Sequence, residues 1–63
     1  MTETQKLLFR GLEAFRVPKG IAAEIFVRLH EEERQVQMMD YMVSHESATP
    51  ENLLNEARRI SGE

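Results

Sequence analysis

Apolar residues recur along this chain at three- and four-residue intervals, the spacing that places them on one face of an α-helix. Thr2 and Gln5 precede the first apolar stripe and fit a capping box, in which each side chain bonds the backbone N–H of the other residue. Pro18 disfavours helical geometry in the residue before it and suits the first turn of a new helix. Thr49 and Pro50 mark a further start, as N-cap and first helical residue. The pattern predicts an all-α fold.

The stripes and starts together predict a small compact bundle of four short helices with no strands. The helices are expected near residues 3–15, 18–29, 31–45 and 50–61, in a single domain covering residues 1–63. A chain of this length is near the lower limit at which one apolar core is enough for stability. The expected core consists of Leu8, Leu12, Phe15, Ile25, Phe26, Leu29, Val36, Met39, Val43, Leu54, Ala57 and Ile60.

The least clear boundary is the one near His30. Seven positions separate Leu29 from Val36, so helical phase is kept, and one helix over residues 18–45 is the alternative. We favour a break at Leu29 or His30, because a continuous helix of that length would be about 40 Å long and a chain this short could not cover it. The three glutamates at 31–33 also suit a first turn, where carboxylates meet the positive end of the helix dipole.

The expected helix at 31–45 has an unusually wide apolar arc, wider than one neighbouring helix can cover. The arc is formed by Val36, Met38, Met39, Tyr41, Met42 and Val43. This helix is therefore either central in the bundle or leaves part of the arc for a partner. Methionines suit both uses, since they fill irregular cores and also form adaptable binding surfaces.

Four apolar side chains remain at the edges of the stripes or outside them: Phe9, Val27, Met38 and Tyr41. Large exposed apolar patches usually mark association sites. We therefore predict a non-catalytic protein-interaction or regulatory module that binds itself or another protein. Its surface is expected to centre on Met38 and Tyr41, with Phe9 or Val27 nearby.

Gly11 interrupts the first apolar stripe, where it costs up to about 1 kcal/mol relative to alanine. A glycine on an apolar helix face is typical of a close helix crossing, and a flexible hinge is the alternative. We favour the crossing.

The charge distribution argues against nucleic acid as the main partner. The net charge is −3, with five basic and three acidic residues in 1–30 and three basic and eight acidic residues in 31–63. The alternative function is nevertheless a nucleic-acid-binding protein with an incomplete helix-turn-helix, because a helix ending near His45 and another starting at Thr49 resemble the first two helices of that motif. No third helix follows Gly62, and that half of the chain is acidic.

Catalysis, cofactors and metals are not expected. The chain has no cysteine, two histidines and no glycine-rich phosphate loop, so neither a nucleophile–base pair nor a phosphate site can be assembled. His30 precedes three glutamates, but their spacing matches no common metal motif. We also expect no membrane span and no signal peptide, and therefore a soluble cytoplasmic protein.

Overall fold

The helix boundaries follow the local sequence signals closely. The computed structural model describes residues 1–62, which form α1 (Glu3–Ala14), α2 (Lys19–Arg28), α3 (Glu32–Ser44) and α4 (Pro50–Ser61). No strand is present in that part of the chain. The predicted all-α bundle of four short helices is confirmed. Glu63, the last residue of the predicted domain, lies outside the described residues.

Reciprocal capping boxes open α1 and α4. In α1 the Gln5 backbone N–H donates to the Thr2 hydroxyl over 3.1 Å, and the Thr2 backbone N–H donates to Gln5 Oε1 over 2.8 Å. In α4 the backbone N–H groups of Thr49 and Asn52 donate to each other's side-chain oxygens, both over 3.1 Å. Each box satisfies backbone donors that a helix start leaves without partners. Both predicted starts are confirmed.

The first and last helices end on residues with left-handed backbone geometry. Gly62 follows α4 with φ of 88°, as its position after the last apolar residue predicts. After α1 the same role falls to Arg16, with φ of 60°, and within residues 1–62 no other non-glycine residue has positive φ. The Arg16 N–H bonds the Glu13 carbonyl and the Val17 N–H bonds the Leu12 carbonyl, the pair of bonds that defines a Schellman motif.

The break between the second and third helices is confirmed, and one buried side chain stabilises it. Arg28 ends α2, and α3 starts after Glu31, so a continuous helix over 18–45 does not form. The amide Nε2 of Gln35 donates to the Leu29 carbonyl over 2.8 Å. That carbonyl lies at the end of α2, so the bond satisfies an acceptor that the break would otherwise bury unpaired.

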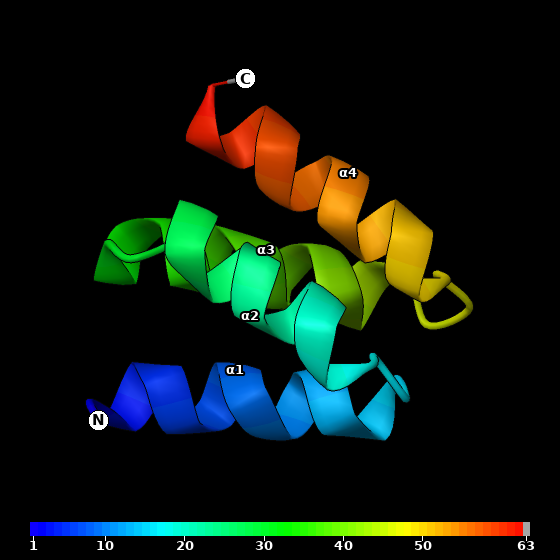
Figure 1. The fold of residues 1–63 in the computed structure, drawn as a ribbon, viewed down its shortest axis with the longest axis horizontal. Helices are drawn as coiled ribbons and strands as arrows, with labels where there is room; N and C mark the ends of the chain where they lie inside the picture. Colours follow the sequence, from blue (N-terminus) through cyan, green and yellow to red (C-terminus); the bar gives the residue numbers. More distant parts are fainter. Residues whose placement is uncertain (63) are drawn as a thin grey trace.

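The four helices enclose a core in a body of about 25 × 24 × 23 Å. In Figure 1, α1 and α3 run in the same direction, α2 returns in front of α3, and α4 lies at the opposite edge from α1. The principal contacts are α1 with α3, α2 with α4 and α3 with α4. The helix α3 therefore packs against two neighbours, α1 and α4, as one of the two alternatives for its wide apolar arc requires.

The core is drawn from all four helices and from the α2–α3 connection. Its buried members are Leu8, Leu12, Ala22, Ile25, Leu29, Met38, Met42, Leu53 and Ala57, with Gln35 among them. Five of the predicted core residues are buried as expected, and another five pack partly buried at its edge: Phe15, Phe26, Met39, Leu54 and Ile60.

The prediction that Val36 and Val43 of α3 belong to the core is wrong. Val36 is 43% exposed and Val43 is 77% exposed. The buried face of α3 runs instead through Gln35, Met38 and Met42, at i, i+3 and i+7. The physical reason is the bond from Gln35 to the α2–α3 connection, which fixes a polar residue at a core position. The rotation of the helix then turns both valines outward.

Candidate functional site

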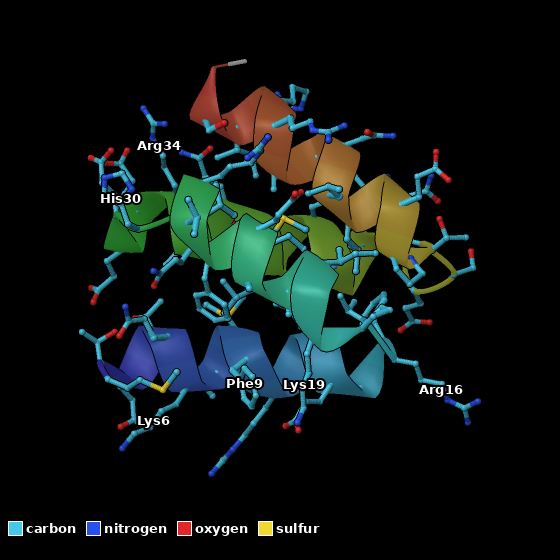
Figure 2. All side chains as sticks on the ribbon, viewed as in Figure 1. Lys6, Phe9, Arg16, Lys19, His30 and Arg34 are labelled. Atoms are coloured by element: carbon cyan, nitrogen blue, oxygen red, sulfur yellow. The ribbon has the colours of Figure 1, made fainter. Side chains whose placement is uncertain are left out.

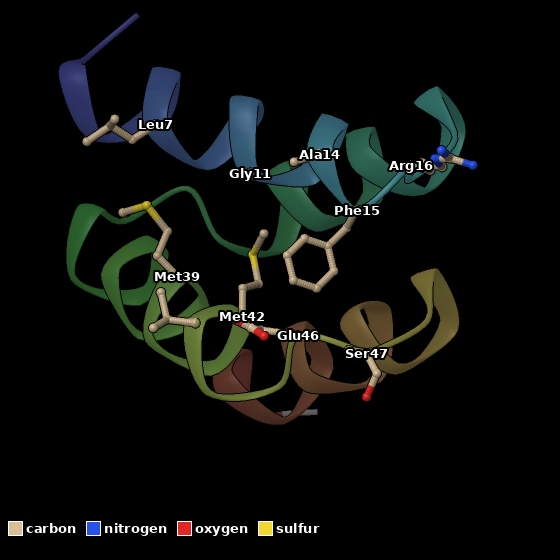
Figure 3. Close-up of a pocket in the computed structure, with 11 residues that line it drawn as sticks. Leu7, Gly11, Ala14, Phe15, Arg16, Met39, Met42, Glu46 and Ser47 are labelled. Atoms are coloured by element: carbon tan, nitrogen blue, oxygen red, sulfur yellow. The ribbon is translucent and has the colours of Figure 1, made fainter.

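An apolar groove lies between α1 and α3 and is the candidate functional site. It has a volume of about 670 Å³ and continues past α3 into the α3–α4 connection. The groove is lined by Leu7, Gly11, Ala14, Phe15, Arg16, Met39, Met42, Val43, Glu46, Ser47 and Ala48. Figure 3 shows the side chains of Phe15, Met39 and Met42 pointing into the space between the two helices. The lining is therefore apolar along its length and polar at one end.

The groove is open because α1 presents small residues along it. A Cβ built on Gly11 would lie 2.8 Å from Met42 Cε, so the Met42 side chain fills the space that a larger residue would occupy. The close helix crossing predicted at Gly11 is not what the structure shows, because its neighbour is the tip of the Met42 side chain and not the backbone of α3. Ala14 lies about one turn later in α1, and its small side chain also fills little of the groove. The outer wall on this side is Leu7, which is 51% exposed.

On the other side, α3 contributes a second exposed apolar stripe. Val36, Met39 and Val43 lie at i, i+3 and i+7, so they follow one line along the helix. Met39 is partly buried against the core, and both valines are exposed. The wide apolar arc expected for this helix is thus present. The structure buries one side of the arc and leaves the side facing α1 open.

Met38 lies in the core, contrary to its expected place at the centre of the exposed surface. It has no exposed area, because it occupies the buried face of α3 that Gln35 sets. Tyr41 lies on the side of α3 toward α4 and is half-buried. Its ring stacks on the His45 ring, with centroids 4.0 Å apart and an angle of 14° between the planes. An interaction surface on α3 cannot therefore centre on Met38.

Phe9 and Val27 lie on other parts of the molecule. Phe9 faces Phe26, with ring centroids 6.3 Å apart. The two rings line a smaller hollow between α1 and α2, of about 530 Å³, and Figure 2 shows Phe9 there, close to Lys19. Val27 does not line this hollow and is 74% exposed on the outer face of α2. The structure thus does not gather the four predicted interface residues into one patch.

Charged residues border the α1–α3 groove in an ordered way. On α1, Arg10 lies three residues after Leu7 and four before Ala14, which places it beside the groove on the outer face. On α3, Asp40 holds the matching position between Val36 and Val43. Both side chains are exposed.

The end of the groove repeats this arrangement, with Arg16 on the α1 side and Glu46 on the α3 side. In the described part of the chain, no ion pair engages Arg10, Arg16, Asp40 or Glu46. The α1 border therefore carries both signs of charge, since the exposed Glu3 lies seven residues before Arg10 on the same helix face, whereas the α3 border carries anions.

A separate polar cluster lies where α3 meets α4. The imidazole Nδ1 of His45 is 2.9 Å from the Tyr41 carbonyl, which can only accept, so Nδ1 carries the proton. On α4, Arg59 Nε donates to Glu56 Oε1 over 3.0 Å. This hydrogen bond lowers the pKa of Glu56; burial opposes the shift, and the charges of Arg59 and His45 add to it. The same hydrogen bond raises the pKa of Arg59.

The two histidines are not brought together. His30 lies in the α2–α3 connection, with Nδ1 3.4 Å from the Val27 carbonyl, and Figure 2 shows it at the start of α3. His45 is the C-cap at the other end of that helix. Among residues 1–62, no group of three or more His, Asp or Glu side chains is placed to hold a metal ion.

Comparisons of this chain with protein-family models, with curated protein sequences and with solved structures find no match. None of the helices within residues 1–62 combines the length and apolar character required to cross a membrane.

Sequence reasoning missed most of the groove because it assigned Val36, Met39 and Val43 to the core. The signal that could have corrected it is the spacing of Gln35, Met38 and Met42, which also lies on one helix face. Leu7 lies at the edge of the apolar stripe of α1, while Leu8 and Leu12 fill the core.

Proposed function

We propose that this chain is a non-catalytic protein-interaction module that binds its partner through the groove between α1 and α3. The observation that carries the proposal is that exposed apolar side chains line both sides of the groove, Leu7 on α1 and Val43 on α3. Burial of apolar surface contributes about 25 cal/mol per Å², so solvent contact along this face is unfavourable. Contiguous apolar patches of this kind usually mark binding sites.

The lining suits a helical partner. Two roughly parallel helices with small residues between them form a groove into which an amphipathic helix can lay its apolar face. Met39 and Met42 can change rotamer at low cost, so the groove can adapt to the side chains it receives. The expected cytoplasmic location of the protein stays a prediction.

Nucleic-acid binding is less well supported by the arrangement of charges. The half of the chain that contains α3 and α4 carries a charge of −5. In α4, Arg59 is held by Glu56, so this cation is not free for a phosphate. Phosphate neutralisation by free Lys and Arg dominates affinity for DNA and RNA.

The test is a selection of helical peptides on the immobilised protein, followed by NMR mapping of a selected peptide. We expect shifts at Leu7, Met39 and Val43. Val43→Asp should abolish binding, because it buries a charge in the apolar contact. Val27→Asp is the matched control, since that valine is equally exposed on the far helix, and it should leave binding unchanged.

Two results would overturn the proposal. One is a selected peptide that maps away from the groove or ignores Val43→Asp. The other is salt-sensitive binding of duplex DNA in sedimentation at two salt concentrations, which would favour the nucleic-acid alternative, because apolar contacts do not weaken as salt rises.

A further inference from the structure

We propose that the occupant of the α1–α3 groove is an amphipathic helix of another protein that carries lysine or arginine along the edge lying over α3. This inference rests on the proposed function and names the chemistry of its partner. It is argued from the charges that flank α3, from the floor of the groove and from its length.

The side of α3 that borders the groove carries only acidic charges. Glu33 and Asp40 lie about 20° apart around the helix at roughly 100° per residue, directly beyond the exposed apolar stripe of α3. Glu32 lies in line with that stripe in the first turn, and Glu46 lines the far end of the groove. All four side chains are exposed. A partner that lies along the stripe therefore meets carboxylates at its α3 edge.

No cation of the described chain neutralises this edge. Arg34, the basic residue of α3, lies roughly opposite the exposed stripe and pairs with Glu31 over 3.4 Å. Within residues 1–62, none of the four carboxylates forms an ion pair. Charges at the rim of a contact select among partners and speed their encounter. The α3 edge thus favours cations on the partner and disfavours anions.

The α1 side of the groove gives no such preference. Glu3 and Arg10 lie on one face of α1 and differ in sign. At the end of the groove, Arg16 faces Glu46 of the α3 side. The charge selection therefore comes from α3 and acts on one edge of the partner. The same row of carboxylates disfavours a nucleic acid or an anionic membrane surface as the occupant.

The floor of the groove suits the bulky apolar side chains of a helix. Gly11 and Ala14 leave space on the α1 side, and the Met42 tip lies beneath Gly11. Met39 lines the α3 side. Methionine tips change shape at low cost, so the floor can fit leucine, methionine or aromatic side chains. A helix supplies such anchors on one face at i, i+4 and i+7.

The length of the acidic edge indicates a partner of about four turns. The lined part of α1 runs from Leu7 to Phe15, about 12 Å at 1.5 Å rise per residue. On α3 the exposed Val36 and then Glu33 precede Met39, the first groove residue of that helix, and add about 9 Å. A helix of about 15 residues therefore covers the groove and reaches the whole acidic edge.

The test uses designed amphipathic peptides of about 15 residues that share one apolar face. One peptide carries lysines on a single flanking edge, a second carries glutamates at the same positions, and the other edge is glutamine in both. We expect the lysine peptide to bind roughly tenfold more tightly at low salt. The advantage should shrink at about 1 M salt, where the Debye length is about 3 Å, while apolar binding persists.

Binding direction gives a sharper readout. A third peptide carries its lysines on the opposite edge, so it must reverse its direction to place them over α3. A paramagnetic label at the peptide N-terminus should therefore broaden NMR signals near Leu7 for one lysine peptide and near Phe15 for the other. A common direction for both would overturn the inference.

Asp40→Lys is the matched variant, and it should remove the preference for lysine and the control of direction. Glu24→Lys changes the net charge equally on α2, which contributes no residue to the groove, and should leave both unchanged. Both positions are exposed, and circular dichroism checks that both variants are folded. Equal effects of the two variants would mean that net charge alone acts, which contradicts the inference.

The outcomes separate this inference from the proposed function. If lysine and glutamate peptides bind equally and Val43→Asp abolishes both, the groove binds helices without selecting cations, and only the inference fails. If no designed or selected peptide binds the groove, the proposed function fails and the inference fails with it.

Discussion

The methyl group of Met42 in α3 packs against Gly11 in α1, only 2.8 Å from the position that the Cβ of any other residue at position 11 would take. The contact holds the two helices at the same height and sets the floor of the groove. A glycine in the middle of a helix is thereby explained by packing, since its propensity is about 1 kcal/mol worse than that of alanine.

The effect of Gly11→Ala should depend on Met42. In the wild-type background the gain of about 1 kcal/mol in helix propensity is offset by the displacement of the Met42 tip, and we expect little net change. In a Met42→Leu background, whose side chain is shorter, the same substitution should stabilise by about 1 kcal/mol. Urea unfolding of the four proteins in a double-mutant cycle measures the coupling. Equal effects in both backgrounds would show that the contact carries no energy.

Truncation of α3 should distinguish its two faces. Met38→Ala removes a fully buried side chain and should cost about 2–5 kcal/mol in the free energy of unfolding. Val36→Ala, on the exposed stripe, should cost less than about 1 kcal/mol. Thermal or urea unfolding is the measurement. The reverse ranking would mean that the helix has the rotation expected from its sequence.

Local signals were enough to predict the helix boundaries, and they were not enough to predict the rotation of α3. Thr2, Pro18 and Thr49 act within a few residues, so their effect can be read from the sequence. Gln35 acts through the Leu29 carbonyl, which a periodicity argument does not include. Counting valines as core and glutamine as surface is the usual choice. Here the Leu29 carbonyl at the helix break holds Gln35 in the core, and the valines are exposed instead.

The buried bond of Gln35 can be tested with two isosteric changes. Gln35→Glu keeps the shape and loses the donor, so a carboxylate would face the Leu29 carbonyl in the core. Gln35→Met loses the donor too, but it also removes Oε1, a buried atom that has no hydrogen-bond partner. We expect the glutamate variant to be the less stable of the two by more than about 1 kcal/mol at neutral pH. Urea unfolding should show this order. Equal stabilities would mean that position 35 is hydrated.

Arg16→Gly should stabilise the monomer by about 1 kcal/mol, because glycine adopts the left-handed geometry after α1 without a Cβ penalty. The measurement is urea unfolding at low protein concentration, where association does not contribute. Arg16→Ala is the control, since it removes the charge and keeps the strain. An alanine variant as stable as the glycine variant would mean that the charge, and not the backbone, sets the cost.

The Glu56–Arg59 ion pair of α4 should make the free energy of unfolding depend on pH in the acidic range. The pKa of Glu56 is lowered in the folded state, so its contribution is present above the ordinary value of 4.5 and is lost as pH falls through the lowered pKa. Glu56→Gln should therefore destabilise at pH 7 and have no effect in strong acid. Arg59 is largely exposed, so solvent screens the pair and the loss is small. Thermal unfolding of wild type and Glu56→Gln at both pH values tests this, and an equal effect of the substitution at both would contradict it.

The candidate site was less predictable than the fold. The spacing of apolar residues showed that the apolar arc of α3 is wider than one neighbouring helix can cover, and this led to the interaction hypothesis. Which side of the arc is exposed depends on where α1 and α4 lie, and this is decided by contacts between residues far apart in the sequence, such as Gly11 and Met42. A single sequence holds no direct record of those contacts.

The two capping boxes bear on the order of folding. The bonds of Thr2 and Thr49 join residues three apart, so they can form before any tertiary contact and favour transient α1 and α4 helices in the unfolded chain. The starts of α2 and α3 have no side-chain cap bond. These middle helices depend on Gln35 reaching Leu29 and on the core. We therefore expect the backbone amides of α1 and α4 to become protected from hydrogen exchange first during folding, and those of α2 and α3 last.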